Sequence, residues 1–294
     1  MLGLDREVST CTGFSAQAID ITDPDELRSV IQRFAPDECY HLAAHHRSSA
    51  ATTEDALSEA NDEREHIRVN LLATLRLLQL LREIRPSCRV FLAGSCHMFG
   101  AVRSSIQTES TPFCPHASYG ITKVAAWHFA KSYRERGLLF CSMGILYNHE
   151  SPRRASHFLS ARIAQGVVDI VKRRTDHLVV GNLSAAVDWG FAGDYVDAMW
   201  RMLQHEEPDD FIVASGELHR VKDFVELAFE HVGLDWHSYV RQDSSVYRPV
   251  HDGVYHGDIS KIRQRLGWTP TTSFKALVGM MVDDRLSRDE RARG

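Results

Sequence analysis

The chain has 294 residues, of which 44% are hydrophobic and 25% charged, and its formal net charge is −5 at pH 7. That composition belongs to a globular protein long enough to bury a large core, and it excludes a disordered or fibrous chain. The negative balance gives no electrostatic footprint for nucleic acid, and no apolar run reaches the roughly 18 residues of a membrane span.

Two further patterns bear on location and metal content. The first ten residues, MLGLDREVST, lack the basic and apolar regions of a signal peptide, and the six cysteines are scattered with no CxxC pair. These features predict a cytoplasmic protein with reduced thiols. The sixteen histidines show no HExxH motif and no Cys/His ligand spacing, so we predict no metal site.

Short apolar strands alternate with helices through the first half of the chain. The predicted helices cover 23–35, 67–84 and 118–137, and the predicted strands cover 38–44, 88–95 and 139–148. This alternation is typical of the α/β class, with a Rossmann-like, doubly wound parallel sheet and helices on both faces. The acidic stretch 50–66 is expected to form a solvated surface loop or helix.

After about residue 150 the pattern changes. Helices are predicted over 156–174, within 188–204, over 221–233 and over 273–286, with short apolar strands between them. We predict a dinucleotide-binding domain over 1–150. Residues 151–294 are predicted to form a smaller, mainly substrate-binding lobe, with some segments returning to the sheet.

Ligands of open α/β sheets bind at the carboxyl ends of the strands, which here are the stretches HLAAHH, GSCHMFG and ILYNHESPRR. Beyond the second of these, Tyr119 and Lys123 are four residues apart on a predicted helix and so share one face. An ammonium beside a phenol lowers the pKa of the phenol, which suits Tyr119 to proton exchange with a carbinol oxygen. The same spacing also arises in solvated aromatic–lysine pairs, so alone it does not define a site.

Several motifs together carry a more specific signal: GSCHMFG, ESTPFCPHASYGITK, ILYNHESPRR, DWGFAGDYVDAMW and RQRLGW. From about residue 17 to residue 286 the chain resembles the extended short-chain dehydrogenase/reductase family, and within it the GDP-mannose 4,6-dehydratases. The resemblance implies conversion of GDP-mannose, or a related NDP-hexose, to a 4-keto-6-deoxy sugar by internal hydride transfer and loss of water. It also implies NADP as cofactor, with NAD as the alternative, and a homodimer or homotetramer.

The resemblance assigns the catalytic residues. It makes Tyr119 the acid/base at the C4 hydroxyl, Lys123 the residue that binds the nicotinamide ribose, and Ser95 the hydroxyl that polarises the C4 oxygen. His97 stands where the family has a glutamate that takes the C5 proton and protonates the C6 leaving group. Either the imidazole replaces that carboxylate, or elimination is lost and His97 only lines the site. Cys96 is expected to be a buried, inert thiol.

Binding residues follow from the same resemblance. Besides Tyr119 and Lys123, it places these residues at the cofactor: Asp20, Ile21, Leu42, Ala43, Ala44, His149 and Arg154. It places Ser95, Asn148 and Arg248 at the nucleotide sugar. Asp23, close to the adenine-binding turn, is also suited to cap the first helix. His45 and His46 replace the family's Gln-Ser pair, and either a polar loop or direct contact is open for them.

The chain departs from the family most at its front. No G-x-G-x-x-G turn occurs, and MLGLDREVST aligns with the end of the family's first helix and the start of its second strand. The central first strand is therefore expected to be missing, through a misassigned start or in a truncated paralogue. The family's arginine-rich loop is replaced by STCTGFSAQ, which weakens the case for NADP over NAD. Two other functions stay open: an NDP-sugar 4-reductase or epimerase without elimination, and a catalytically silent paralogue.

Overall fold

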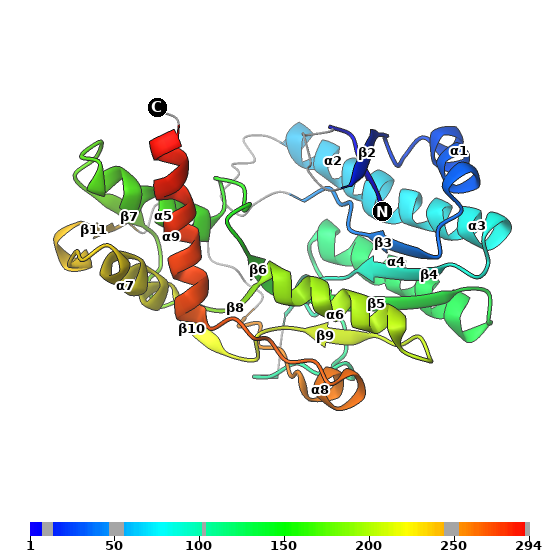
Figure 1. The fold of residues 1–294 in the computed structure, drawn as a ribbon. Coiled ribbons are helices and arrows are strands. Elements are labelled where there is room, and N and C mark those ends of the chain that lie inside the picture. Colours follow the sequence, from blue (N-terminus) through cyan, green and yellow to red (C-terminus); the bar gives the residue numbers. More distant parts are fainter. Residues whose placement is uncertain (8–13, 47–55, 102–103, 244–252, 292–294) are drawn as a thin grey trace.

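The computed structural model describes residues 1–7, 14–46, 56–101, 104–243 and 253–291 (Figure 1). The first half contains β1 (Leu2–Asp5), β2 (Ser15–Ala18), α1 (Pro24–Phe34), β3 (Glu38–His41), α2 (Ala56–Glu65), η1 (His66–Ala73), α3 (Thr74–Ile84), β4 (Arg89–Ala93), η2 (Cys96–Met98), α4 (Ser118–Glu135) and β5 (Phe140–Leu146). The helices predicted at 23–35 and 118–137 are confirmed, with ends that shift slightly. Asp23 caps α1 by accepting from the backbone N–H groups of Asp25 and Glu26, and Gly137 follows α4 with a φ of 62°.

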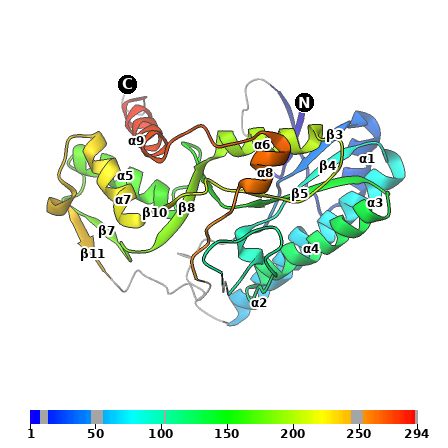
Figure 2. The same ribbon diagram turned by 90° about the horizontal axis from the view of Figure 1, so that it is seen from below.

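A parallel sheet runs through the middle of the structure. Its strand order is β3-β4-β5-β9, where β9 (Phe211–Val213) comes from the second half of the chain. All three pairings are parallel, and Val90, Phe91 and Leu92 of β4 are buried. Figure 2 shows α4 and α6 (Ala192–Gln204) on opposite faces of this sheet. The predicted Rossmann-like, doubly wound α/β fold is therefore confirmed.

The N-terminal strands form a separate element. β1 and β2 pair in parallel as a two-stranded sheet of their own, and within the described residues no strand connects them to β3. At the unpaired edge of β3, Tyr40 and the adjoining Leu42 are 37% and 51% exposed. This gap lies where the sequence predicts that the central first strand is missing.

The helix predicted over 67–84 is not uniform. Its first part, η1, is a π-helix, and only α3 is α-helical. Side chains of η1 are tied to other elements: Asn70 accepts from the backbone N–H of His45 at 2.8 Å and donates to its carbonyl at 3.0 Å, and His66 Nδ1 lies 2.8 Å from Ser118 Oγ. π-Helical segments are rare and are found frequently at functional sites, and periodicity in the sequence does not reveal them.

The second half builds its own core beside the sheet. It contains β6 (Asn148–Glu150), α5 (Leu159–Val171), β7 (Leu178–Val180), β8 (Ala186–Phe191), β10 (Leu218–Arg220), α7 (Val221–His231), η3 (Trp236–Ser238), β11 (Val240–Gln242), α8 (Ser260–Leu266) and α9 (Phe274–Arg291). Its core includes Trp189, Phe224 and Phe274, whose rings pack within 5.8 Å of one another. The domain boundary near residue 150 stays a prediction. Within the described residues, no helix is long and apolar enough to cross a membrane.

A buried ion pair links β9, from the second half of the chain, to elements of the first half. Asp210, just before β9, accepts from both terminal nitrogens of Arg134 on α4, at 2.7 and 2.8 Å, and from Trp127 Nε1 at 2.7 Å. It also accepts from the backbone N–H of Met143 on β5 at 3.2 Å. The side chains of Arg134 and Asp210 are only 14% and 11% exposed. The aspartate thus fixes β9, α4 and β5 relative to one another.

We expect Asp210→Ala to lower the free energy of unfolding by about 3–5 kcal/mol, because Arg134 would keep a buried charge without its partner. Urea denaturation of both proteins measures the difference. Glu230→Ala is the matched control: it removes a pair with Lys275 whose side chains are 61% and 71% exposed, and should cost less than about 1 kcal/mol. Equal losses in the two variants would contradict this account.

Candidate active site

The candidate site lies where β3, β4 and β5 end. After β4, Ser95 caps η2, and its Oγ accepts from the backbone N–H of His97 at 3.3 Å. Tyr119 lies in the first turn of α4, and its ring is 6.0 Å from the His97 ring in an edge-to-face arrangement. The structure therefore brings together Ser95, His97, Tyr119 and Lys123, the residues that the sequence predicts to be catalytic.

The close approach of α4 to η2 depends on Gly120. A Cβ atom at that position would lie 2.5 Å from the backbone oxygen of His97 and 2.9 Å from Cβ of Pro115. Only a glycine lets the first turn of α4 pack against the turn that carries His97. Sequence reasoning missed this residue, although a glycine inside a predicted helix is a signal for close backbone packing.

Lys123 is buried one turn further along α4. Its Nζ donates to the backbone oxygen of Ala93 at 2.8 Å and lies 5.7 Å from the centre of the Tyr119 ring. Burial lowers the pKa of Lys123 to about 8. An ammonium has three donors, so two remain for other partners after the bond to Ala93.

The pKa of Tyr119 differs from the sequence-based expectation. Burial raises it to about 12, and a hydrogen bond with Ser95 only partly opposes that effect. The expectation of a lowered pKa was wrong for the protein alone, because burial outweighs the attraction that the spacing to Lys123 suggested. Burial likewise raises the pKa of Cys96 to about 12, so the thiol is buried as predicted, and its low reactivity stays a prediction.

More histidines surround Tyr119 than the sequence predicts. His46 lies edge-on to its ring at 4.7 Å, and the ring of the buried His66 lies at 5.9 Å. Burial, and then the positive charge of His97, lower the pKa of His46 to about 4 even though its side chain is open to solvent on one side. His45 turns away to Asp62, with Nε2 3.0 Å from Oδ1. No sequence signal pointed to His66, because π-helical packing brings it to the site.

Most of the residues predicted to bind the cofactor follow β3 or lie on and after β6, which belongs to a different sheet. Leu42, Ala43 and Ala44 follow β3 with exposed side chains. At β6, His149 Nδ1 lies 2.9 Å from the Tyr147 carbonyl oxygen, and burial lowers the pKa of His149. Arg154 Nε lies 3.1 Å from Glu150 Oε2.

At the other end of the predicted cofactor site, Asp20 precedes the half-buried Ile21. Asp20 Oδ1 accepts from the N–H and hydroxyl of Thr22 at 2.9 and 2.8 Å, and these bonds lower the pKa of Asp20. Asp23 caps α1, as predicted, and adenine binding by this turn stays a prediction.

These residues fit one end of a dinucleotide better than the other. The spare donors of Lys123, beside Tyr119 and next to the small residues Ala43 and Ala44, suit a nicotinamide ribose. Within the described residues, no glycine-rich turn between a strand and a helix is present to cradle a diphosphate.

For the sugar nucleotide, Asn148 is exposed at the start of β6. Arg248 lies outside the described residues. Tyr255 was not predicted, and its ring lies 5.4 Å from His97. Among the described residues, no group of three or more His, Cys, Asp or Glu side chains is placed to hold a metal ion.

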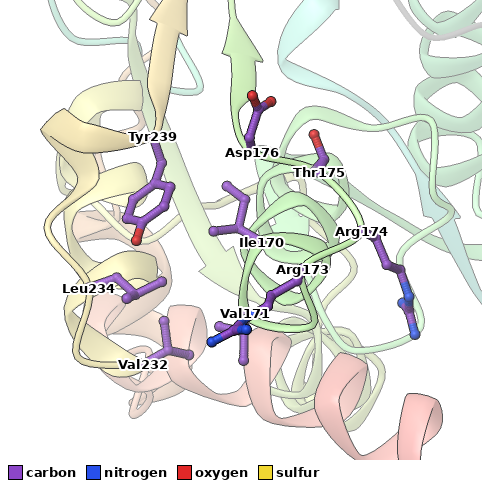
Figure 3. A pocket seen from close by; sticks show the side chains of 9 residues that line it. All are labelled: Ile170, Val171, Arg173, Arg174, Thr175, Asp176, Val232, Leu234 and Tyr239. Carbon is purple, nitrogen blue, oxygen red and sulfur yellow. The ribbon is translucent and has the colours of Figure 1, made fainter.

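A cavity of about 780 Å³ lies elsewhere, in the second half of the chain (Figure 3). It is lined by Ile170, Val171, Arg173, Arg174, Thr175, Asp176, Val232, Leu234 and Tyr239. None of the predicted site residues lines it. The chemistry-bearing side chains at the strand ends, rather than this cavity, therefore define the candidate active site.

Comparison with known proteins shows to which family this chain belongs. A family model described as GDP-mannose 4,6 dehydratase matches residues 5–281. The chain belongs to the GDP-mannose 4,6-dehydratase family. GDP-mannose 4,6 dehydratase 2 of Arabidopsis thaliana is 41% identical over 276 residues, covering 92% of this chain and 72% of the relative. The human GDP-mannose 4,6 dehydratase is 36% identical over 282 residues, covering 90% and 74%.

Solved structures share the fold. RMD from Pseudomonas aeruginosa complexed with NADPH superposes with a TM-score of 0.81 at 22% identity, covering 95% of this chain and 92% of that one. The dTDP-glucose 4,6-dehydratase from Bacillus anthracis in complex with NAD gives 0.80 at 16% identity, covering 98% and 88%. At these identities the likeness concerns the fold alone.

We expect Gly120→Ala to destabilise this dehydratase-family protein by about 1–3 kcal/mol, because the new methyl group meets a backbone oxygen that cannot move away. Gly279→Ala on α9 is the control. Its nearest neighbour would be the side chain of His231 at 3.2 Å, which can shift. Urea denaturation measures both, and a Gly120 variant as stable as the Gly279 variant would show that α4 does not need this close approach.

A second expectation concerns pH. The pKa of Lys123 is lower in the folded chain than its usual 10.5, so between about pH 8 and 10 the unfolded chain binds more protons. The contribution of this group to the free energy of unfolding therefore rises with pH in that window. Compared with Lys123→Met, wild-type stability should gain on the order of 2 kcal/mol from pH 8 to pH 10. Denaturation at pH 8, 9 and 10 measures this gain, and parallel curves for the two proteins would contradict it.

Proposed function

We propose that this protein converts GDP-mannose, or a closely related NDP-hexose, to the 4-keto-6-deoxy sugar with loss of one water. The observation that carries the proposal is that Ser95 and His97, after the end of β4, meet Tyr119 and Lys123, near the start of α4, in a member of this family. We also propose NADP as the cofactor, with NAD as the alternative, because the related folds are described with either NADPH or NAD. A cytoplasmic location stays a prediction.

A bound nicotinamide would supply the hydride chemistry at C4 and C6, and the chain's own residues must move every proton. Tyr119 takes the proton of the C4 hydroxyl, and Ser95 holds that oxygen. Burial keeps Tyr119 protonated in the protein alone, so a positive charge beside it is needed to favour the phenolate near neutral pH. The ammonium of Lys123 directs its spare donors to the ribose.

The resemblance to the family implies a glutamate at position 97, where this chain has a histidine. The His97 ring lies 6.0 Å from the Tyr119 ring and 5.4 Å from the Tyr255 ring. An imidazole exchanges protons close to neutral pH, so His97 can supply the proton that the C6 hydroxyl needs in order to leave as water.

The protein is proposed to form a homodimer, with a homotetramer as the alternative. The packed elements α4 and η1 both expose large apolar side chains: Ile121, Phe129, Ile67 and Leu72 are 49%, 39%, 46% and 54% exposed. Scattered apolar residues are common on protein surfaces, but two adjacent helical elements that share this feature favour an interface.

The test is mass spectrometry of the sugar after incubation of the protein with GDP-mannose and NADP⁺ or NAD⁺. Wild type should yield a product lighter by one water. Tyr119→Phe should lower the rate at least about 100-fold because it removes the acid/base. His97→Gln should lose dehydration but still reduce the cofactor. A wild-type product that is reduced or epimerised at C4 without water loss would replace the proposal with the reductase/epimerase function, and no product would favour a silent paralogue.

A further inference from the structure

Two histidines flank Tyr119 from adjacent strands. His46 follows the end of β3 and His97 follows the end of β4, and their rings lie 4.7 and 6.0 Å from the Tyr119 ring. The two imidazoles are 6.4 Å apart between ring centres. That separation is longer than a direct contact and short enough for one substrate group to reach both rings.

Aromatic packing holds His46 in this position. Its ring stacks on Phe158 at 6.0 Å with an interplanar angle of 15°, and the Arg154 guanidinium lies 3.5 Å from the centre of the Phe158 ring. Together with the edge-on contact to Tyr119, this stacking gives His46 a defined orientation beside the acid/base.

We propose that the two proton transfers of the dehydration are divided between these histidines, with His46 as the base at C5 and His97 as the acid at C6. This proposal rests on the proposed function. His46 takes the C5 proton from the 4-keto sugar, and the electron pair of that C–H bond forms the C5=C6 double bond. The C6–O bond breaks, His97 gives its proton to the leaving hydroxyl, and water departs. The elimination is redox-neutral. His46 then returns a proton to C5 as C6 receives the hydride that a bound nicotinamide would supply, and His97 regains its proton from solvent.

The chemistry of imidazole allows the base and the acid to be two separate groups. A carboxylate has two equivalent oxygens, so one group can take a proton and then give one. A neutral imidazole has one donor and one acceptor nitrogen on different edges of the ring. A neutral His46 can accept a proton while a protonated His97 donates one, so neither ring has to turn between the two steps.

The charges around His46 agree with this division. Its lowered pKa leaves it neutral at pH 7 and able to accept a proton, although as a weaker base than a free imidazole, and a proton on His97 disfavours a second proton on His46. Arg154, His66 and Lys123 face it from the neighbouring elements, and each lowers its pKa further. The pair therefore carries one proton at a time.

The experiment compares His46→Gln with His45→Gln, a matched control one residue away whose imidazole is paired with Asp62. Each protein is given GDP-mannose and NADP⁺ in D₂O. Deuterium at C5, dehydrated product and the absorbance of reduced cofactor are followed. His46→Gln should lose C5 exchange and product at least about 100-fold while still reducing the cofactor, and His45→Gln should match wild type. Dehydration by His46→Gln at the wild-type rate would overturn the role of His46 as the C5 base, and the proposed function would stand.

A second measurement does not depend on turnover. NMR titration of the histidine ring nitrogens in the protein alone should show His46 protonating near pH 4, and nearer its usual pKa in His97→Gln. If the pKa of His46 is the same in wild type and in His97→Gln, the proposed coupling of the two histidines is overturned. If the titrations are coupled but wild type neither reduces the cofactor nor dehydrates the sugar, the proposed function fails, and the role of His46 fails with it.

Discussion

The site depends on one close backbone contact, where the first turn of α4 lies against the turn that follows β4. Gly120 makes this contact possible, since any Cβ there would collide with the His97 carbonyl. Tyr119 precedes Gly120 in the chain and His97 supplies the opposing oxygen, so this contact also sets how far Tyr119 lies from His97. Lys123, one turn later on the same helix, then reaches the Ala93 carbonyl at the end of β4. The packing of α4 against the turn after β4 thus positions the Tyr119 phenol, the Lys123 ammonium and the His97 imidazole.

The parallel sheet places this contact where a ligand can reach it. β3, β4 and β5 pair in register and end together, so the residues that follow them share one edge. Buried polar links hold that edge in place. Asp210 joins β9, α4 and β5, and Asn70 of the π-helix makes paired backbone hydrogen bonds with His45 after β3. His46 owes its position beside Tyr119 to the second of these links, because Asn70 anchors the residue before it.

The sequence was sufficient for the sheet and for the residues that local spacing brings together. Apolar strands and the four-residue spacing of Tyr119 and Lys123 obey rules that act within one element. It was not sufficient for properties set by distant parts of the chain. The pKa of Tyr119 depends on burial by several elements, and the packing of His46 on Phe158 joins residues more than a hundred positions apart. The π-helix escaped prediction because its register is set by tertiary bonds from Asn70 and His66.

An imidazole at position 97, in place of the carboxylate that the family resemblance implies, changes the electrostatics of the site. A buried carboxylate beside Tyr119 would oppose formation of the phenolate, whose pKa burial has already raised to about 12. A neutral imidazole adds no such repulsion, and a protonated one favours the phenolate. A second imidazole at His46 can supply the base, and its lowered pKa keeps it neutral at pH 7 without adding a negative charge. Two imidazoles can therefore provide both the base and the acid of the elimination without placing a carboxylate beside Tyr119.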